Sequence, residues 1–66
     1  MRVIIDGFPE DVSPDLSLAE LIEGRNEETV HLIVEINRRF VHRRDYPATI
    51  LKEGDRVEII HPAFGG

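Results

Sequence analysis

The last two residues of this 66-residue chain, Gly65 and Gly66, are those whose type and position are best suited to chemistry. Glycine has no side chain to pack and loses more conformational freedom than other residues when it is ordered, so stability does not favour a terminal pair. A diglycine instead provides a thin strip of backbone that ends in an α-carboxylate and can enter a tunnel that any Cβ would block. Chain ends are often frayed without a function. We favour a functional tail and expect residues 61–66 to be flexible.

The other reactive residue types lack a workable arrangement. Cysteine is absent, which removes disulfides, thiolate nucleophiles and thiolate metal ligands. His31, His42 and His61 do not have the close spacing of metal ligands, and no Ser-His-Asp arrangement is discernible. The adjacent acids Glu10 and Asp11 are interpreted as a solvated turn. We therefore predict no metal site, no catalytic residue and no stably bound cofactor.

Length and overall charge narrow the possible functions. A chain of this length forms one domain, residues 1–66, whose small core leaves no room for an enclosed active site. The net charge of -5 argues against a nucleic-acid partner. No apolar run is long enough to cross a membrane, and residues 1–6 turn acidic too early for a signal peptide. We expect a cytoplasmic protein that is monomeric when free.

The charges are unevenly distributed. Residues 1–30 contain eight acidic and two basic side chains, whereas residues 31–66 contain six basic and five acidic ones. Four of the bases form a basic cluster: Arg38, Arg39, Arg43 and Arg44. We interpret the cluster first as a solvated hairpin, next as a docking surface for an acidic partner, and last as an RNA-binding surface.

One short helix is predicted after residue 17. Ser17 and Glu20 have the spacing of a capping box, in which each side chain accepts a hydrogen bond from the other residue's backbone. Gly24 is a natural helix stop. The apolar side chains Leu18, Leu21 and Ile22 share one face of this helix and are assigned to the core.

Alternating and β-branched residues predict the strands. Residues 2–6 form a hairpin with residues 8–12, whose proline places that second strand at a sheet edge. Residues 30–36 are predicted as the longest strand, and the turn Asn37-Arg38 leads to a return strand over 39–43. Tyr46-Pro47 is expected to break regular structure.

A final strand over residues 56–60 places Val57 and Ile59 inward. We also expect Leu51 to lie beneath the sheet. Together these elements predict an α+β domain in which one main helix packs on one face of a small mixed sheet of four to five strands.

The sequence resembles the ubiquitin-like sulfur-carrier proteins, above all the thiamine-pathway carriers of the ThiS type. The resemblance is densest over residues 35–37, 41–43 and 51–59 and at the terminal diglycine. The tail 62–66 also has some similarity to the molybdopterin-synthase small subunit. The resemblance implies the β-grasp fold.

The resemblance also implies a chemistry for the tail. In such families an ATP-dependent enzyme of the ubiquitin-activating type adenylates the terminal glycine, here Gly66, and Gly65 permits passage through that enzyme's channel. Sulfur from a persulfide, supplied by a sulfurtransferase or cysteine desulfurase, then converts the glycine to a thiocarboxylate. A thiazole synthase would receive the sulfur. The chain would be a carrier and co-substrate, not an enzyme.

Other functions are compatible with the same residues. The sulfur acceptor could belong to molybdopterin synthesis, tRNA thiolation or sulfur amino-acid synthesis. The chain could instead be a ubiquitin-like modifier attached to lysine, or a plain interaction module.

A docking surface beside the tail is also predicted. In a β-grasp sheet the outward positions Ile4, Ile33 and Ile60 could form an exposed apolar patch, although β-branched residues also occur singly on strands. Phe64, two residues before the end, is a candidate anchor in a partner's pocket.

Overall fold

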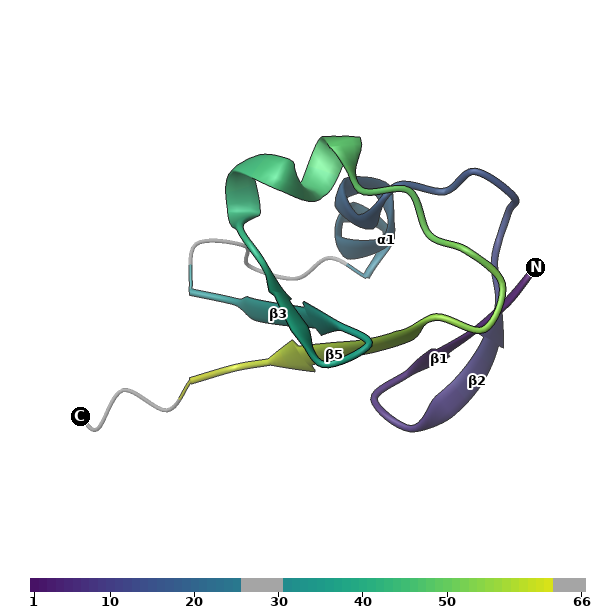
Figure 1. The fold of residues 1–66 in the computed structure, drawn as a ribbon, viewed down its shortest axis with the longest axis horizontal. Helices are drawn as coiled ribbons and strands as arrows, with labels where there is room; N and C mark the ends of the chain where they lie inside the picture. Colours follow the sequence, from purple (N-terminus) through teal and green to yellow (C-terminus); the bar gives the residue numbers. More distant parts are fainter. Residues whose placement is uncertain (26–30, 63–66) are drawn as a thin grey trace.

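The sheet and helices occupy separate layers in the computed structural model, which describes residues 1–25 and 31–62. Figure 1 shows the strands below and the helices above. The elements, in chain order, are β1 (Arg2–Ile5), β2 (Phe8–Asp11), α1 (Leu18–Gly24), β3 (Ile33–Ile36), β4 (Arg39–Val41), the 3₁₀ helix η1 (Arg43–Ala48) and β5 (Arg56–Ile60). The predicted flexible tail lies outside the described residues from position 63 onward.

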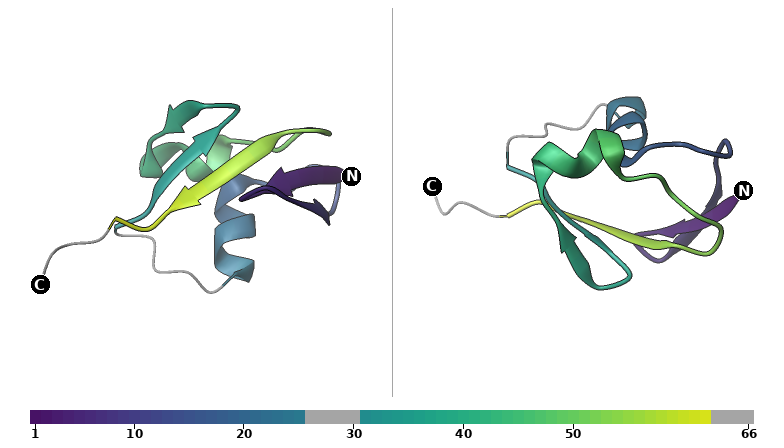
Figure 2. Two further views of the ribbon diagram at one scale, coloured as in Figure 1. Left: turned by 90° about the horizontal axis from the view of Figure 1, so that it is seen from below. Right: turned by 45° about the horizontal axis from the view of Figure 1, so that its top comes forward.

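The last strand, β5, is the centre of the sheet. The strand order is β2-β1-β5-β3-β4, with β5 parallel to β1 and antiparallel to β3. Figure 2 shows β5 between these two neighbours. Its residues alternate between exposed and buried, with Val57 and Ile59 inward. The predicted directions of Val57, Ile59 and Ile60 are therefore confirmed.

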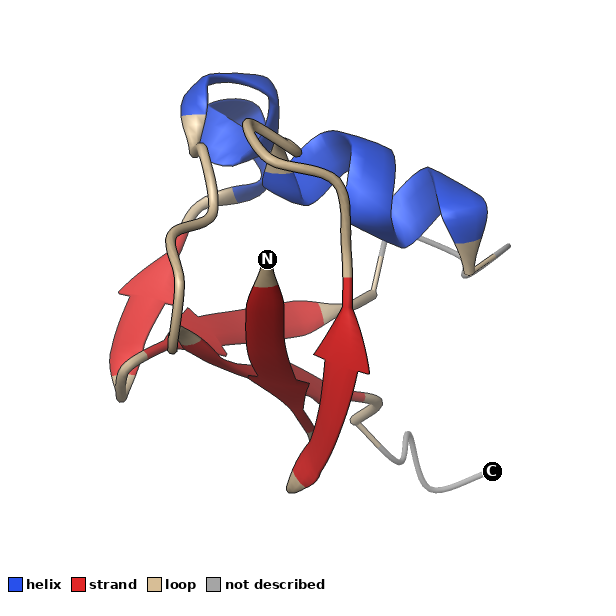
Figure 3. Cartoon of the chain, turned by 90° about the vertical axis from the view of Figure 1, so that its right-hand side faces the viewer, coloured by secondary structure: helices blue, strands red, loops and turns tan. Residues whose placement is uncertain are grey.

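The core lies between the sheet and the helical layer. Both α1 and η1 cover the same face, as Figure 3 shows, and no helix in the described part of the chain covers the other face. The buried apolar residues are Val3, Ile5, Leu18, Leu21, Ile22, Leu32, Val34, Tyr46, Leu51, Val57 and Ile59. A five-stranded mixed sheet that wraps one main helix in this way is the predicted β-grasp fold.

The helix begins as its sequence predicts. The Ser17 hydroxyl accepts the Glu20 backbone N–H at 3.1 Å, and the Glu20 carboxylate accepts the Ser17 N–H at 3.0 Å. The helix ends at Gly24, but Arg25 is its C-terminal cap and has a φ of -89°. Gly24 therefore does not end the helix through a left-handed conformation.

The strand before the second hairpin is shorter than predicted. It begins at Ile33, while Val30 lies outside the described residues, and the five-residue β5 is the longest strand described. The predicted alternation holds, since Leu32 and Val34 are buried and Ile33 is exposed.

The segment after β4 is the largest departure from the predicted elements. Residues 42 and 43 do not continue the strand, and Arg43–Ala48 form η1, with Pro47 inside it. Tyr46 is only 4% exposed, and this burial raises the pKa of its hydroxyl. Packing of the ring into the core, where η1 contacts α1, outweighs the local tendency of proline to interrupt structure.

The acids Glu10 and Asp11 do not form a solvated turn. Both lie on β2, where Asp11 pairs with Arg2 at 3.1 Å and Glu10 pairs with Arg25 at 3.1 Å. The antiparallel register of β1 and β2 places Asp11 directly beside Arg2. The second pair joins the edge strand to the end of α1.

Candidate functional site

β5 carries the chain into its C-terminal tail, and it is held on both sides almost to its end. Ile60 pairs with Ile33 on β3. On the other side β1 ends at Ile5, but the Asp6 carboxylate accepts the Ile59 backbone N–H at 2.9 Å. This side chain takes the place of a backbone carbonyl beyond the end of β1. The tail therefore begins from a fixed point.

Two of the predicted docking residues lie side by side. Ile33 and Ile60 are directly opposed on the uncovered face and are 37% and 39% exposed. Directly opposed side chains on one face of a sheet are in contact range. The pair adjoins the point where the chain leaves the sheet. Whether it binds a partner stays a prediction.

Ile4 does not join this pair. It lies beside Arg56, at the opposite end of β5, with Glu58 between the two positions on the same face. Four residues of strand span roughly 13 Å. The parallel register of β1 and β5 places Ile4 near the start of the strand, which the alternation of β1 alone did not indicate.

Phe40 extends the apolar face and is not among the docking residues predicted from the sequence. It lies opposite Glu35, and Glu35 lies opposite Glu58. The Phe40 ring is 55% exposed and makes an edge contact with His42, with ring centroids 4.7 Å apart. We define the docking face as Ile33, Ile60 and Phe40 together with the two glutamates. The signal for Phe40 was its position three residues after the turn residue Asn37, which fixes its face.

Several motif residues behind the family resemblance have structural roles. The Asp55 carboxylate accepts the Asn37 side-chain N–H at 3.0 Å and the Lys52 backbone N–H at 2.9 Å. The Asn37 side-chain oxygen accepts the Arg56 N–H at 3.0 Å. These bonds join the β3–β4 turn to the loop before β5, so they position the strand that leads to the tail.

The predicted tail residues Phe64, Gly65 and Gly66 lie outside the described residues. Within residues 1–25 and 31–62, no three histidine or acidic side chains gather as a metal site. None of the described helices is long and apolar enough to cross a membrane. The four arginines of the basic cluster are exposed.

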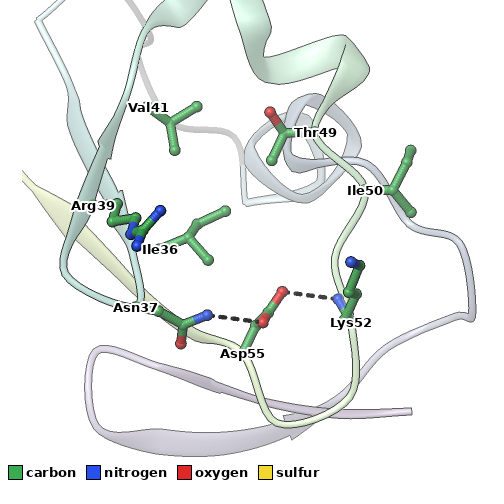
Figure 4. Close-up of a pocket in the computed structure, with 8 residues that line it drawn as sticks. All are labelled: Ile36, Asn37, Arg39, Val41, Thr49, Ile50, Lys52 and Asp55. Carbon is green, nitrogen blue, oxygen red and sulfur yellow. Dashed lines mark hydrogen bonds between the residues drawn. The ribbon is translucent and has the colours of Figure 1, made fainter.

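A groove lies away from the tail, near the start of β5. Figure 4 shows it between the β3–β4 hairpin and the segment 49–55. Its position separates it from the chemistry predicted at Gly66. It is therefore not part of the candidate site.

The fold defines a class of protein: a ubiquitin-like β-grasp domain whose last strand, β5, lies at the centre of the sheet. The chain belongs to the ThiS family, whose sequence model matches residues 5–66. The predicted resemblance to sulfur carriers of the ThiS type is thereby confirmed.

Individual relatives agree with this assignment. The crystal structure of the thiamine biosynthesis protein ThiS from Geobacter metallireducens is 29% identical, covers both chains fully and has a TM-score of 0.86. The solution structure of a thiamine biosynthesis protein from the same organism has a TM-score of 0.79, with all of this chain and 88% of the other covered. A thiazole synthase from Magnetococcus marinus is 30% identical over all 66 residues, which span 20% of that protein's length.

Proposed function

We propose that this chain carries sulfur for thiamine biosynthesis as a thiocarboxylate at Gly66. The observation that carries the proposal is the family match, which extends to the terminal diglycine. The fixed exit of β5 supports it, because a partner can bind the rigid domain and receive the tail at a defined position. The similar thiamine biosynthesis protein of Geobacter metallireducens supports the pathway.

The proposed chemistry takes place in partner enzymes. The Gly66 carboxylate attacks the α-phosphorus of ATP, which releases pyrophosphate and forms an acyl-adenylate. The adenylate is needed because a free carboxylate is anionic and resonance-stabilised, whereas AMP is a good leaving group. A persulfide then attacks the acyl carbon, AMP leaves, and a thiol reduces the resulting acyl disulfide to the thiocarboxylate. The carrier itself contributes no catalytic group.

A thiazole synthase is the acceptor that the comparisons favour. The Magnetococcus marinus protein of that name contains a stretch similar to the whole of this chain. A stretch similar to this chain within a protein named thiazole synthase supports the action of this chain with such an enzyme. We therefore assign to this chain an adenylating enzyme, a persulfide donor and a thiazole synthase as partners in the cytoplasm.

Intact-mass measurement tests the proposed chemistry. Incubation with ATP, the adenylating enzyme and a persulfide donor should raise the mass by about 16 Da, since sulfur replaces one oxygen. The control is a chain that lacks Gly66, which should not change. A product joined to lysine of a second protein would instead indicate a modifier, and an unchanged mass would leave only an interaction module.

The docking face makes a second measurement possible. Ile60→Asp and Phe64→Ala should each slow adenylation about tenfold, because a central apolar anchor typically contributes that much to a protein interface. Phe8→Ala is the matched control, since Phe8 is 72% exposed and lies on β2, two strands away from β5. Pyrophosphate release gives the rate, and circular dichroism verifies the fold. Unchanged rates in both variants would contradict the assignment of Ile60 and Phe64 as residues that dock on a partner.

A further inference from the structure

The groove in Figure 4 has an apolar floor between the β3–β4 hairpin and the segment 49–55. Its volume is about 620 Å³. Ile36 and Val41 line it from the hairpin, and Ile50 lines it from the opposite wall. Ile50 is 46% exposed, although Leu51 beside it is buried. The groove therefore presents apolar surface that the domain does not cover.

One wall of the groove is a free strand edge. β4 is the last strand of the sheet, so β3 is its only paired neighbour in the described part of the chain. The two-residue turn makes Ile36 and Arg39 the first hydrogen-bonded pair, and the next pair, Glu35 and Phe40, is then a non-hydrogen-bonded one. The backbone N–H and C=O of Phe40 consequently point away from β3, toward the open edge.

The opposite wall presents a second free edge. Ile50 forms an isolated antiparallel bridge with Ser17. Its two bonds run from the Leu18 N–H to the Thr49 carbonyl at 2.8 Å and from the Leu51 N–H to the Leu16 carbonyl at 2.9 Å. These bonds use the neighbours of Ile50, so its own N–H and C=O point away from Ser17. An extended segment lying in the groove could pair with a strand edge on both sides.

Charge selects the kind of segment that fits. Arg39 and Lys52 line the groove, and in the described part of the chain neither side chain has an ion-pair partner. Asp55 is the acid among the lining residues, and both of its carboxylate oxygens already accept hydrogen bonds. The chain as a whole has a net charge of -5, but these two cations make the groove locally positive. The groove therefore favours a segment that carries carboxylates.

We propose that this groove binds an extended peptide segment of a partner protein, with β-branched residues at its centre and acidic residues beside them. The segment adds as a strand between β4 and Ile50, its apolar side chains cover the floor, and its carboxylates face Arg39 and Lys52. This site does not involve Gly66. A partner bound there leaves Ile33 and Ile60, on β3 and β5, accessible to another protein.

A symmetric heptapeptide, Asp-Asp-Val-Val-Val-Asp-Asp with blocked ends, tests the proposal in either strand direction. We expect it to shift the NMR signals of the Phe40 and Ile50 amides and to slow their hydrogen exchange. The same peptide with proline as its central residue should bind more weakly, because proline lacks the amide hydrogen that the pairing needs. A peptide with lysine in place of aspartate should not bind.

Matched charge reversals locate the site. Arg39→Glu with Lys52→Glu should weaken peptide binding about tenfold, because opposed charges become like charges at the contact. Arg43→Glu with Arg44→Glu makes the same change in net charge outside the groove lining and should weaken binding by at most about twofold. These variants replace exposed side chains, so folding is retained and is verified by the amide spectrum.

Three results would overturn the proposal. The first is the absence of shifts at Phe40 and Ile50 with peptide at about 1 mM, where even weak binding is detectable. The second is equal binding of the aspartate and lysine peptides. The third is tighter binding of oligothymidylate than of the acidic peptide in the same groove, which would assign the cations to a nucleic acid.

Discussion

Asp55 illustrates how a residue can identify a family without taking part in its chemistry. Its carboxylate receives hydrogen bonds from the Asn37 side chain and from the Lys52 backbone. The two donors come from the hairpin turn and from the loop before β5. Loss of such a polar partner costs free energy because the donors are left without an acceptor. The presence of Asn37 and Asp55 among the residues that carry the family resemblance is thus explained by their role in placing β5.

Glu20 makes the stability of the domain depend on pH. The Ser17 backbone N–H donates to its carboxylate, and this lowers the pKa of Glu20 from its ordinary value of 4.5. The charged form therefore stabilises the folded state above that value, and the contribution is lost as the pH falls through the lowered pKa.

Glu20→Gln should isolate this charge effect, because glutamine can still accept the bond at the N3 position. We expect the native chain to be more stable than the variant at about pH 7 and this advantage to be smaller at about pH 3. Urea unfolding at both values measures it. A difference that does not change with pH would contradict the assignment to Glu20.

The two hairpins are built on the same kind of turn with different residues. Asp6 and Gly7 have φ values of 50° and 87°, and Asn37 and Arg38 have values of 53° and 68°. Positive φ at both central positions is the type I′ geometry that suits the twist of a hairpin. Glycine occupies the second position in one turn and arginine in the other.

Arg38→Gly should stabilise the domain by about 0.5–1 kcal/mol, since the cost of a left-handed side-chain residue exceeds the entropy cost of glycine. Gly7→Arg should destabilise it by a similar amount, because no atom within 4 Å obstructs a side chain there and only the backbone is strained. Arg38→Ala is the control, since it removes the charge and keeps the strain. Thermal unfolding of all three variants shows whether each substitution stabilises or destabilises the domain. A gain in Arg38→Ala equal to that in Arg38→Gly would assign the effect to charge.

Elements with a local signature could be predicted, and elements set by distant packing could not. The capping box of α1 and the alternation in β5 depend on neighbouring residues, so both appear where the sequence places them. η1 was missed because Tyr46-Pro47 is locally a break, and only contact with α1 makes it a buried turn of helix. The start of β3 was misplaced because Leu32 is buried without being part of the ladder.

The same division applies to the candidate site. Ile33 and Ile60 were found by alternation, which gives the face of each side chain. The separation of Ile4 from the Ile33–Ile60 pair, and the position of Phe40 on the same face as that pair, depend on strand order and register. The groove was not foreseen, because it needs the hairpin and the segment 49–52 to face one another across the domain.

The stability of the whole domain depends on a small core. Leu51 and Ile50 are neighbours in the sequence with opposite exposure, so substitutions at the two positions measure the contribution of burial. Leu51 is 2% exposed and Ile50 is 46% exposed. Leu51→Ala should cost about 2–5 kcal/mol, which is comparable to the entire stability of so short a chain. Ile50→Ala should cost less than about 1 kcal/mol, because its side chain already faces water. Chemical denaturation measures both, and equal losses would contradict the burial assigned to Leu51.

The central position of β5 has a mechanical consequence. A force applied beyond residue 60 would pass first into a strand bonded to β1 on one side and to β3 on the other. Because the strand is pulled along its own axis, the hydrogen bonds on both sides resist together instead of opening one after another. The Asp6 contact to Ile59 closes the last gap on the β1 side. The arrangement of β5 should therefore keep the domain folded when a force is applied at that end of the strand.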